Sequence, residues 1–187
     1  MSSRKTIGDL SELHDNHINV SSNEIYFYCD INNKTACSLL KNINFLISNN
    51  LNKTIKVFLQ SDGGCLYSSL GLYDYISSLS QTNIEIIVMG NAFSGAALLL
   101  QAADKRVCMP SSKIMIHEGH AFVPEDNLNN IKEFISAYEN EVALMVEIFA
   151  AKTGQKTSVL KKKMKNDIYL NAEEALEMGL VDEIWGS

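Results

Sequence analysis

The feature that most constrains the fold is an alternation, beginning near Glu24, of short apolar runs with longer amphipathic segments. Short apolar runs predict buried strands, and apolar residues at helical spacing predict helices that cover a sheet. Strands and helices in alternation are typical of an α/β layer fold. Since no linker or internal repeat interrupts the pattern, we predict a single α/β domain over residues 23–187, preceded by a polar N-terminal arm over residues 1–22.

The boundaries of the expected elements follow from the same pattern. A turn at Gly90 to Phe93 is expected between the third strand and the third helix. In the last helix, Asn171 and Glu174 match an N-cap with its reciprocal acidic partner, and Gly179 is typical of a helix end. Strands are predicted at 24–29, 55–59, 84–89, 106–109, 113–117 and 180–185, and helices at 34–48, 65–79, 94–103, 126–153 and 171–178.

The longest periodic segment, Asp126 to Thr153, exceeds the average length of a helix in a globular domain. A helix of this length projects beyond a domain this small, so the domain itself does not cover the whole apolar stripe. Oligomers hide such surfaces symmetrically. We therefore predict that the outer turns pack against another subunit.

The composition excludes several classes of partner. With 16 Lys and Arg against 22 Asp and Glu, the chain has a net charge of -6 and would repel a nucleic-acid backbone. No stretch approaches the roughly 20 apolar residues that span a membrane, and the polar N-terminus lacks the apolar core of a secretory signal. The four cysteines are scattered without the short spacings of a zinc site and fit reduced thiols. We expect a soluble, cytoplasmic protein without nucleic-acid or membrane partners, and without a cofactor or metal.

Ser94 is the first candidate for chemistry. It follows an apolar strand and opens a helix, whose free amide groups and dipole favour developing negative charge. The next residue, Gly95, allows close approach of a substrate and offers an amide to an oxyanion. The alternative is tight helix packing, because Ala92 stands where the Gly-x-Ser-x-Gly elbow of the α/β-hydrolases has its first glycine.

A second junction of a strand and a helix also contains serine and glycine residues. The sequence Ser61-Asp62-Gly63-Gly64 joins a strand to a helix, and its glycines can adopt positive φ angles and present amide groups to a ligand. Gly64 is thus a candidate for a second oxyanion donor, and an ordinary strand-to-helix turn is the alternative.

Histidine and aspartate residues supply the remaining candidates. His117 ends a strand, where an imidazole can accept a serine proton, and a structural histidine is the alternative. His120 competes locally for the role of base, whereas His14 and His17 are expected to be solvated. Asp167 is an orienting carboxylate or a turn former. Ser94, His117 and Asp167 supply together the nucleophile, base and carboxylate of a serine hydrolase.

Four blocks of the sequence together resemble the proteolytic subunit of the Clp protease, the ClpP family. They are SDGG at 61–64, LGLYD at 70–74, MGNAFSGAALLLQAADKRVCMPSSKIMIH at 89–117 and DIYLNAEEALEMGLVDEI at 167–184. The same order of motifs covers about Glu24 to Ile184. The resemblance implies that Ser94 is the nucleophile, His117 the base and Asp167 the third member of the triad, with the oxyanion amides at Gly64 and Gly95.

The resemblance also implies an architecture and partners. The expected fold is a crotonase-like or ClpP-like β-α-β spiral with a protruding handle helix at about 126–153, in a homo-oligomer of two stacked heptameric rings. Members of the family cut peptides alone, and cut proteins when a hexameric AAA+ unfoldase supplies the unfolded polypeptide. This chain has no Gly-x-x-x-x-Gly-Lys phosphate-binding loop, so we expect the partner to hydrolyse the ATP.

Three departures from the family pattern concern specificity and ring pairing. Asp62 replaces a proline beside the oxyanion loop, and Glu118-Gly119 replaces the Gln-Pro after the histidine. The segment HAFVPEDN at 120–127 replaces a glycine-rich strand that lines the substrate groove and contacts the opposite ring in the family.

These observations predict a serine endopeptidase that cleaves unfolded polypeptides and peptides. A crotonase-type acyl-CoA enzyme shares the pair of amides but needs no serine nucleophile, and a catalytically silent ring-forming subunit is a further alternative. A Ser-Lys dyad that uses Lys113 is a third.

Overall fold

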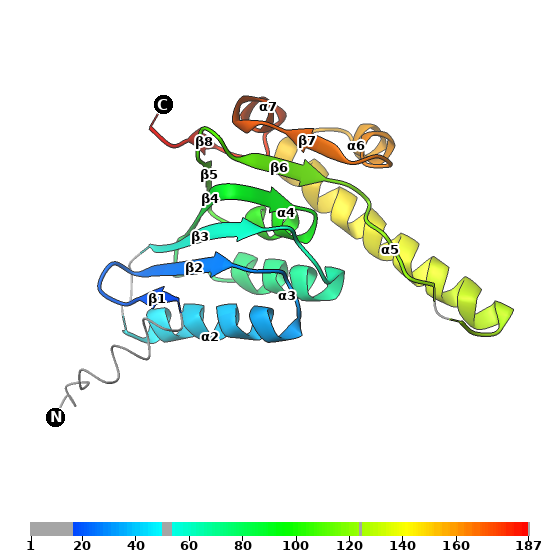
Figure 1. Cartoon of the computed structure of the whole chain (residues 1–187), viewed down its shortest axis with the longest axis horizontal. Helices are drawn as coiled ribbons and strands as arrows, with labels where there is room; N and C mark the ends of the chain where they lie inside the picture. The colour runs from blue at the N-terminus through cyan, green and yellow to red at the C-terminus, as the bar shows by residue number, and fades with distance from the viewer. Residues whose placement is uncertain (1–16, 50–53, 124, 187) are drawn as a thin grey trace.

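The computed structural model describes residues 17–49, 54–123 and 125–186, and these form one sheet with helices packed against it (Figure 1). The strands are β1 (Ile18–Asn19), β2 (Glu24–Tyr28), β3 (Ile55–Ser61), β4 (Ile84–Phe93), β5 (Lys105–Cys108), β6 (Lys113–Ile116), β7 (Ile168–Leu170) and β8 (Glu183–Ile184). The helices are α2 (Asn33–Asn49), α3 (Leu66–Ser77), α4 (Gly95–Leu100), α5 (Leu128–Thr153), α6 (Thr157–Lys163) and α7 (Ala172–Met178).

The centre of the sheet is built from consecutive βαβ units. β2, β3, β4 and β5 pair in parallel in that order, and α2, α3 and α4 lie in the three connections between them. Parallel neighbours require such crossovers, and a helix in each crossover covers the sheet. The predicted α/β fold is thus confirmed.

β4 is longer than predicted and branches the sheet. Its first part, Glu85 to Val88, pairs with β5, and its last part, Asn91 to Phe93, pairs with β6. The prediction of a turn at Gly90 to Phe93 is therefore wrong, because these residues continue β4. A glycine followed by an asparagine suggests a turn from sequence, but pairing with β6 keeps the backbone extended here. This branch places the end of β6 next to the end of β4.

The N-terminal and C-terminal parts of the domain differ from the predictions in detail. Ile18 and Asn19, which the polar composition assigns to the arm over residues 1–22, form β1 and pair antiparallel with β2, while residues 1–16 lie outside the described part. The sequence pattern does not predict the short elements α6 and β7. Strand β8 is shorter than the strand predicted at 180–185. The capping box of Asn171 and Glu174 is confirmed, and Gly179 ends α7 with a φ of 81°.

Helix α5 is buried at one end and exposed at the other. It begins after Asn127, whose side chain accepts hydrogen bonds from two amides of the first turn, and it ends at Gly154. Its buried residues all lie in the second half, whereas Leu128 and Ile135 in the first half are 65% and 41% exposed. Figure 1 shows this first half extending away from the sheet. No helix in the described ranges has the length and apolarity needed to cross a membrane.

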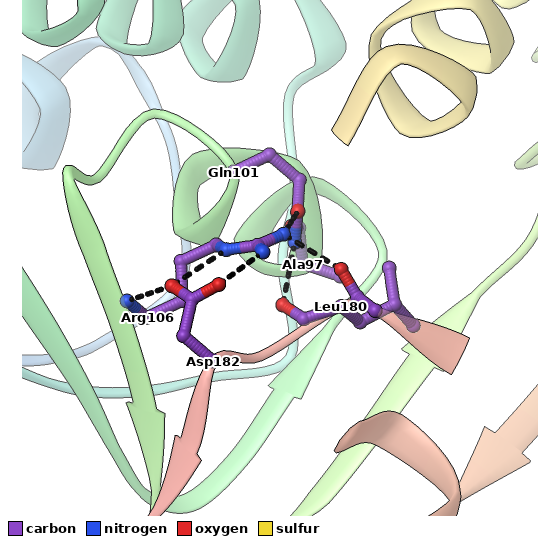
Figure 2. Close-up of polar contacts among 6 residues, drawn as sticks. Ala97, Gln101, Arg106, Leu180 and Asp182 are labelled. Carbon is purple, nitrogen blue, oxygen red and sulfur yellow. Dashed lines mark hydrogen bonds and ion pairs between the residues drawn. The ribbon is translucent and has the colours of Figure 1, made fainter. Parts of the chain in front are cut away.

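A polar cluster of the buried Gln101 and Arg106 with the partly exposed Asp182 holds the far end of α4 (Figure 2). Arg106, at the start of β5, forms an ion pair with Asp182 and donates to the Gln101 side chain at 2.7 Å and to the Gly179 carbonyl at 2.8 Å. Gln101 in turn donates to the carbonyl oxygen of Leu180. Burial would raise the pKa of Asp182, but the hydrogen bonds and charge of Arg106 hold this pKa below its ordinary value. The cluster therefore ties α4, β5 and the segment after α7 together.

Candidate active site

Ser94 lies at the junction of β4 and α4 in an unusual backbone conformation. Its φ of 53° and ψ of -119° are rare for a residue with a side chain. The Ser94 amide donates to the Met115 carbonyl of β6 at 2.8 Å, and α4 behind it is buried at every residue. Strained residues persist where the surrounding structure fixes them, and they concentrate at functional sites.

The three predicted triad residues meet in one line of hydrogen bonds. His117 Nε2 lies 2.7 Å from Ser94 Oγ, and His117 Nδ1 lies 2.9 Å from Asp167 Oδ1. His117 comes directly after β6, and Asp167 directly before β7, and these two strands pair antiparallel. The His117 side chain is 12% exposed and that of Asp167 is 44% exposed. With its proton on Nδ1, the imidazole donates to the carboxylate and accepts from the serine.

The two predicted oxyanion amides are close together, with Gly64 in the loop between β3 and α3 and Gly95 at the first residue of α4. A Cβ atom added at Gly95 would lie 3.5 Å from the Gly64 amide nitrogen. The loop is held by a bridge between Ile31 and Gly64, in which the Ile31 amide donates to the Gly63 carbonyl at 2.6 Å. At Gly64 the φ is 141°, and an added Cβ would lie 2.2 Å from the Ile31 carbonyl oxygen, so only glycine fits.

A cavity of about 350 Å³ opens beside these groups. Tyr138 of α5 lines it, and the Tyr138 hydroxyl donates to the Glu118 carbonyl at 2.9 Å. Burial raises the pKa of this tyrosine. The lining residues are Asp62, Gly64, Cys65, Leu66, Ser94, Gly95, Met115, His117, Glu118, Gly119, His120, Tyr138 and Met145.

Sequence reasoning missed Cys65, Tyr138 and Met145 as parts of the site. Cys65 directly follows the glycine pair, but the sequence predicts for it only a reduced thiol at the start of the helix expected at 65–79. Hydrogen bonds from Ser68 hold the pKa of the Cys65 thiol below its ordinary value, against the opposing effect of burial. Tyr138 and Met145 belong to the apolar stripe of the helix predicted at 126–153, and that pattern does not indicate which turn of the helix faces the cavity.

The departures from the family pattern have visible structural effects. The Asp62 carboxylate accepts a hydrogen bond from the Asn91 side chain at 2.7 Å, and Asp62 is exposed at the cavity. After β6, the Glu118 amide donates to the Met164 carbonyl, and the described residues from His117 to Val123 belong to no strand. The described part of this segment therefore lacks the strand that the resemblance implies.

The other candidates from the sequence lie at different distances from this centre. The His120 and His117 rings meet edge to face with their centroids 5.5 Å apart, and both residues line the cavity. Lys113 is at the opposite end of β6 and pairs with Asn91. His17 is exposed near β2, and its carbonyl accepts from the Tyr26 amide, while His14 lies outside the described residues.

The chain matches a known family over nearly its whole length. A protein-family model described as Clp protease matches residues 13–187. The match includes the residues that line the cavity and all three residues of the hydrogen-bonded line.

Proposed function

Because this chain belongs to the Clp protease family, we propose that it is a serine endopeptidase in which Ser94, His117 and Asp167 form the catalytic triad. Family membership makes the chain a ClpP-type peptidase in general terms. The line of hydrogen bonds from Ser94 through His117 to Asp167 is the observation that carries the assignment of residues.

Acylation begins with proton transfer from Ser94 to His117. His117 Nε2 is within hydrogen-bond distance of the serine oxygen, as a general base must be. Ser94 Oγ then forms a bond to the carbonyl carbon of the scissile peptide. Asp167 accepts a hydrogen bond from Nδ1–H, which keeps this proton on the ring, fixes the tautomer and stabilises the imidazolium that forms.

The amides of Gly64 and Gly95 stabilise the negative charge of the tetrahedral intermediate. Both residues line the cavity beside Ser94. His117 then gives its proton to the leaving amine, and the carbon–nitrogen bond breaks. A water molecule, activated by the same base, hydrolyses the acyl-enzyme and restores Ser94.

The working enzyme is proposed to be a homo-oligomer of two stacked heptameric rings that acts on polypeptides supplied by an AAA+ unfoldase. The exposed apolar residues Leu128 and Ile135 at the free end of α5 support burial against another subunit. No ATP-binding loop of the Gly-x-x-x-x-Gly-Lys type occurs in the sequence, which supports ATP hydrolysis by the partner.

The test is peptidase activity measured across a gel-filtration profile for the wild type and for Ser94→Ala. We expect activity in the oligomer peak of the wild type and none in the same peak of the variant. Peptidase activity in Ser94→Ala would refute the triad. An assembled wild type that cleaves no peptide would indicate a catalytically silent ring subunit, and hydrolysis of an acyl-CoA without peptide cleavage would indicate a crotonase-type enzyme.

A further inference from the structure

Three side chains of types that bind metal ions meet beside the cavity, and two of them, His117 and His120, line it. His117, His120 and Asp167 each offer a ligand atom, and these atoms all lie within 4.8 Å of one another. The spacing His-x-x-His at 117–120 brings the second imidazole back toward the first, and the strand pairing of β6 with β7 brings the carboxylate. Only His117 and Asp167 are used by the proposed mechanism, so His120 has no role in it.

We propose that His117, His120 and Asp167 form a binding site for a divalent transition-metal ion such as Zn²⁺, and that an ion bound there switches off the serine nucleophile. The inhibitory part of this proposal rests on the proposed function, whereas the binding part does not. The ion is an inhibitor in this scheme and takes no part in peptide hydrolysis.

The donor set selects the class of metal. Imidazole nitrogen suits zinc, copper and nickel, while magnesium and calcium prefer oxygen ligands. Two histidines and one carboxylate with an open fourth position form a common zinc arrangement. With bonds of about 2.0–2.2 Å, tetrahedral ligands are separated by roughly 3.4 Å.

Little movement of His117 and Asp167 is needed if Nδ1 of His117 binds the ion, because this nitrogen already faces Asp167, whereas binding through Nε2 requires the ring to turn. His117 Nδ1 and Asp167 Oδ1 are already 2.9 Å apart, so the carboxylate and the first imidazole must separate slightly. His120 makes the larger adjustment. It is exposed and follows the end of β6 on a segment without regular structure, so its side chain can move toward the other two ligands.

Metal binding would remove the catalytic base because a neutral imidazole has one available lone pair. If Nε2 binds the ion, that lone pair no longer faces Ser94 Oγ, which lies 2.7 Å away in the metal-free site. If Nδ1 binds the ion, the proton stays on Nε2, and the ring donates to the serine instead of accepting from it. Either mode also breaks or weakens the contact of His117 with Asp167.

The binding part is tested on the full chain by calorimetry with Zn²⁺ and by visible absorption with Co²⁺, for the wild type, His120→Gln, Ser94→Ala and Cys65→Ser. We expect Ser94→Ala and Cys65→Ser to bind like the wild type, with the Co²⁺ spectrum of nitrogen and oxygen ligands. His120→Gln should weaken binding at least about tenfold, the lower limit for loss of even an outer partner of a metal ligand. Equal affinity in His120→Gln, or loss of binding in Cys65→Ser, would overturn the site.

The inhibitory part is tested by peptide hydrolysis and by fluorophosphonate labelling, with each protein compared with its own metal-free rate. At a free Zn²⁺ concentration of about ten times Kd, both rates of the wild type should fall roughly tenfold and recover with chelator. Mg²⁺ at the same concentration should have no effect. Undiminished labelling in zinc-saturated wild type would refute inhibition. If metal-free wild type cleaves no peptide, the proposed function fails, and the calorimetric and spectral results still decide the binding site.

Discussion

Replacement of Asp167 by asparagine tests the role of the carboxylate with minimal change in shape. In the wild type, Asp167 Oδ1 lies 2.9 Å from His117 Nδ1 and accepts a hydrogen bond from Nδ1–H, so Nε2 faces Ser94 as an acceptor. An asparagine can present its N–H₂ group to Nδ1. The favoured tautomer then carries the proton on Nε2, and the ring can no longer accept a proton from Ser94.

The expected loss follows from the geometry and from the exposure of the carboxylate. A wrong tautomer in a serine-protease triad lowers kcat by about 10⁴, which corresponds to about 5.4 kcal/mol of transition-state stabilisation. The Asp167 side chain is 44% exposed, so water can replace part of its effect and the amide can rotate. We therefore expect a loss of about 10³–10⁴ in kcat, with little change in stability.

The assay is the initial rate of hydrolysis of a fluorogenic peptide, together with the rate of fluorophosphonate labelling. Asp74→Asn is the matched control, because Asp74 is an exposed aspartate on α3 that does not line the cavity. The control should keep the wild-type rates. A folded, oligomeric Asp167→Asn that retains more than about one tenth of wild-type kcat would refute the reasoning, since a tenfold loss amounts to only about 1.4 kcal/mol.

Three further changes test the fold, the oxyanion loop and the assembly. Asp182→Asn should lower the free energy of unfolding in urea by about 1–3 kcal/mol. This is less than the loss expected when a fully buried ion pair is broken, because Asp182 is partly exposed. Arg106 holds the pKa of Asp182 below its ordinary value of about 3.9. The stabilisation is therefore fully present above about pH 3.9 and is lost as the pH falls through the lowered pKa of the folded state. If the free energy of unfolding depended on acid pH in the same way in the variant and in the wild type, this role of Asp182 would be contradicted. Gly64→Ala should lower kcat about 10²–10³-fold, because the added Cβ meets the Ile31 carbonyl and displaces the amide, and an unchanged kcat would argue against an oxyanion role. Ile135→Asp should dissociate the oligomer in light scattering if the free end of α5 is an interface, and an unchanged mass would exclude that residue from it.

The fold could be predicted from the sequence where the signal is local and repeated. The βαβ units and the capping box of α7 follow from hydrophobic spacing and from the residue types at helix ends, and both are present. The end of β4 could not be predicted, because Gly90 to Phe93 is extended only through pairing with β6. Short elements such as β1 and β7 have too few residues for a periodic pattern.

The site was only partly accessible from the sequence. The residue types identified Ser94, His117 and Asp167 as candidates, but each had an ordinary structural alternative. Their proximity depends on the branch of β4 and on the pairing of β6 with β7, and both are long-range features of the sheet. The sequence indicates His120 only as a competing base, because Asp167, the third side chain of the cluster, comes close only through the pairing of β6 with β7.

The central claim is that Ser94 is a nucleophile activated by His117. Mass-spectrometric mapping of the fluorophosphonate adduct on the wild-type chain tests it most directly. We predict a single adduct on the peptide that contains Ser94, and no adduct in Ser94→Ala under the same conditions. An unmodified Ser94 in folded, oligomeric wild type, or an adduct on another residue that persists in Ser94→Ala, would contradict the claim.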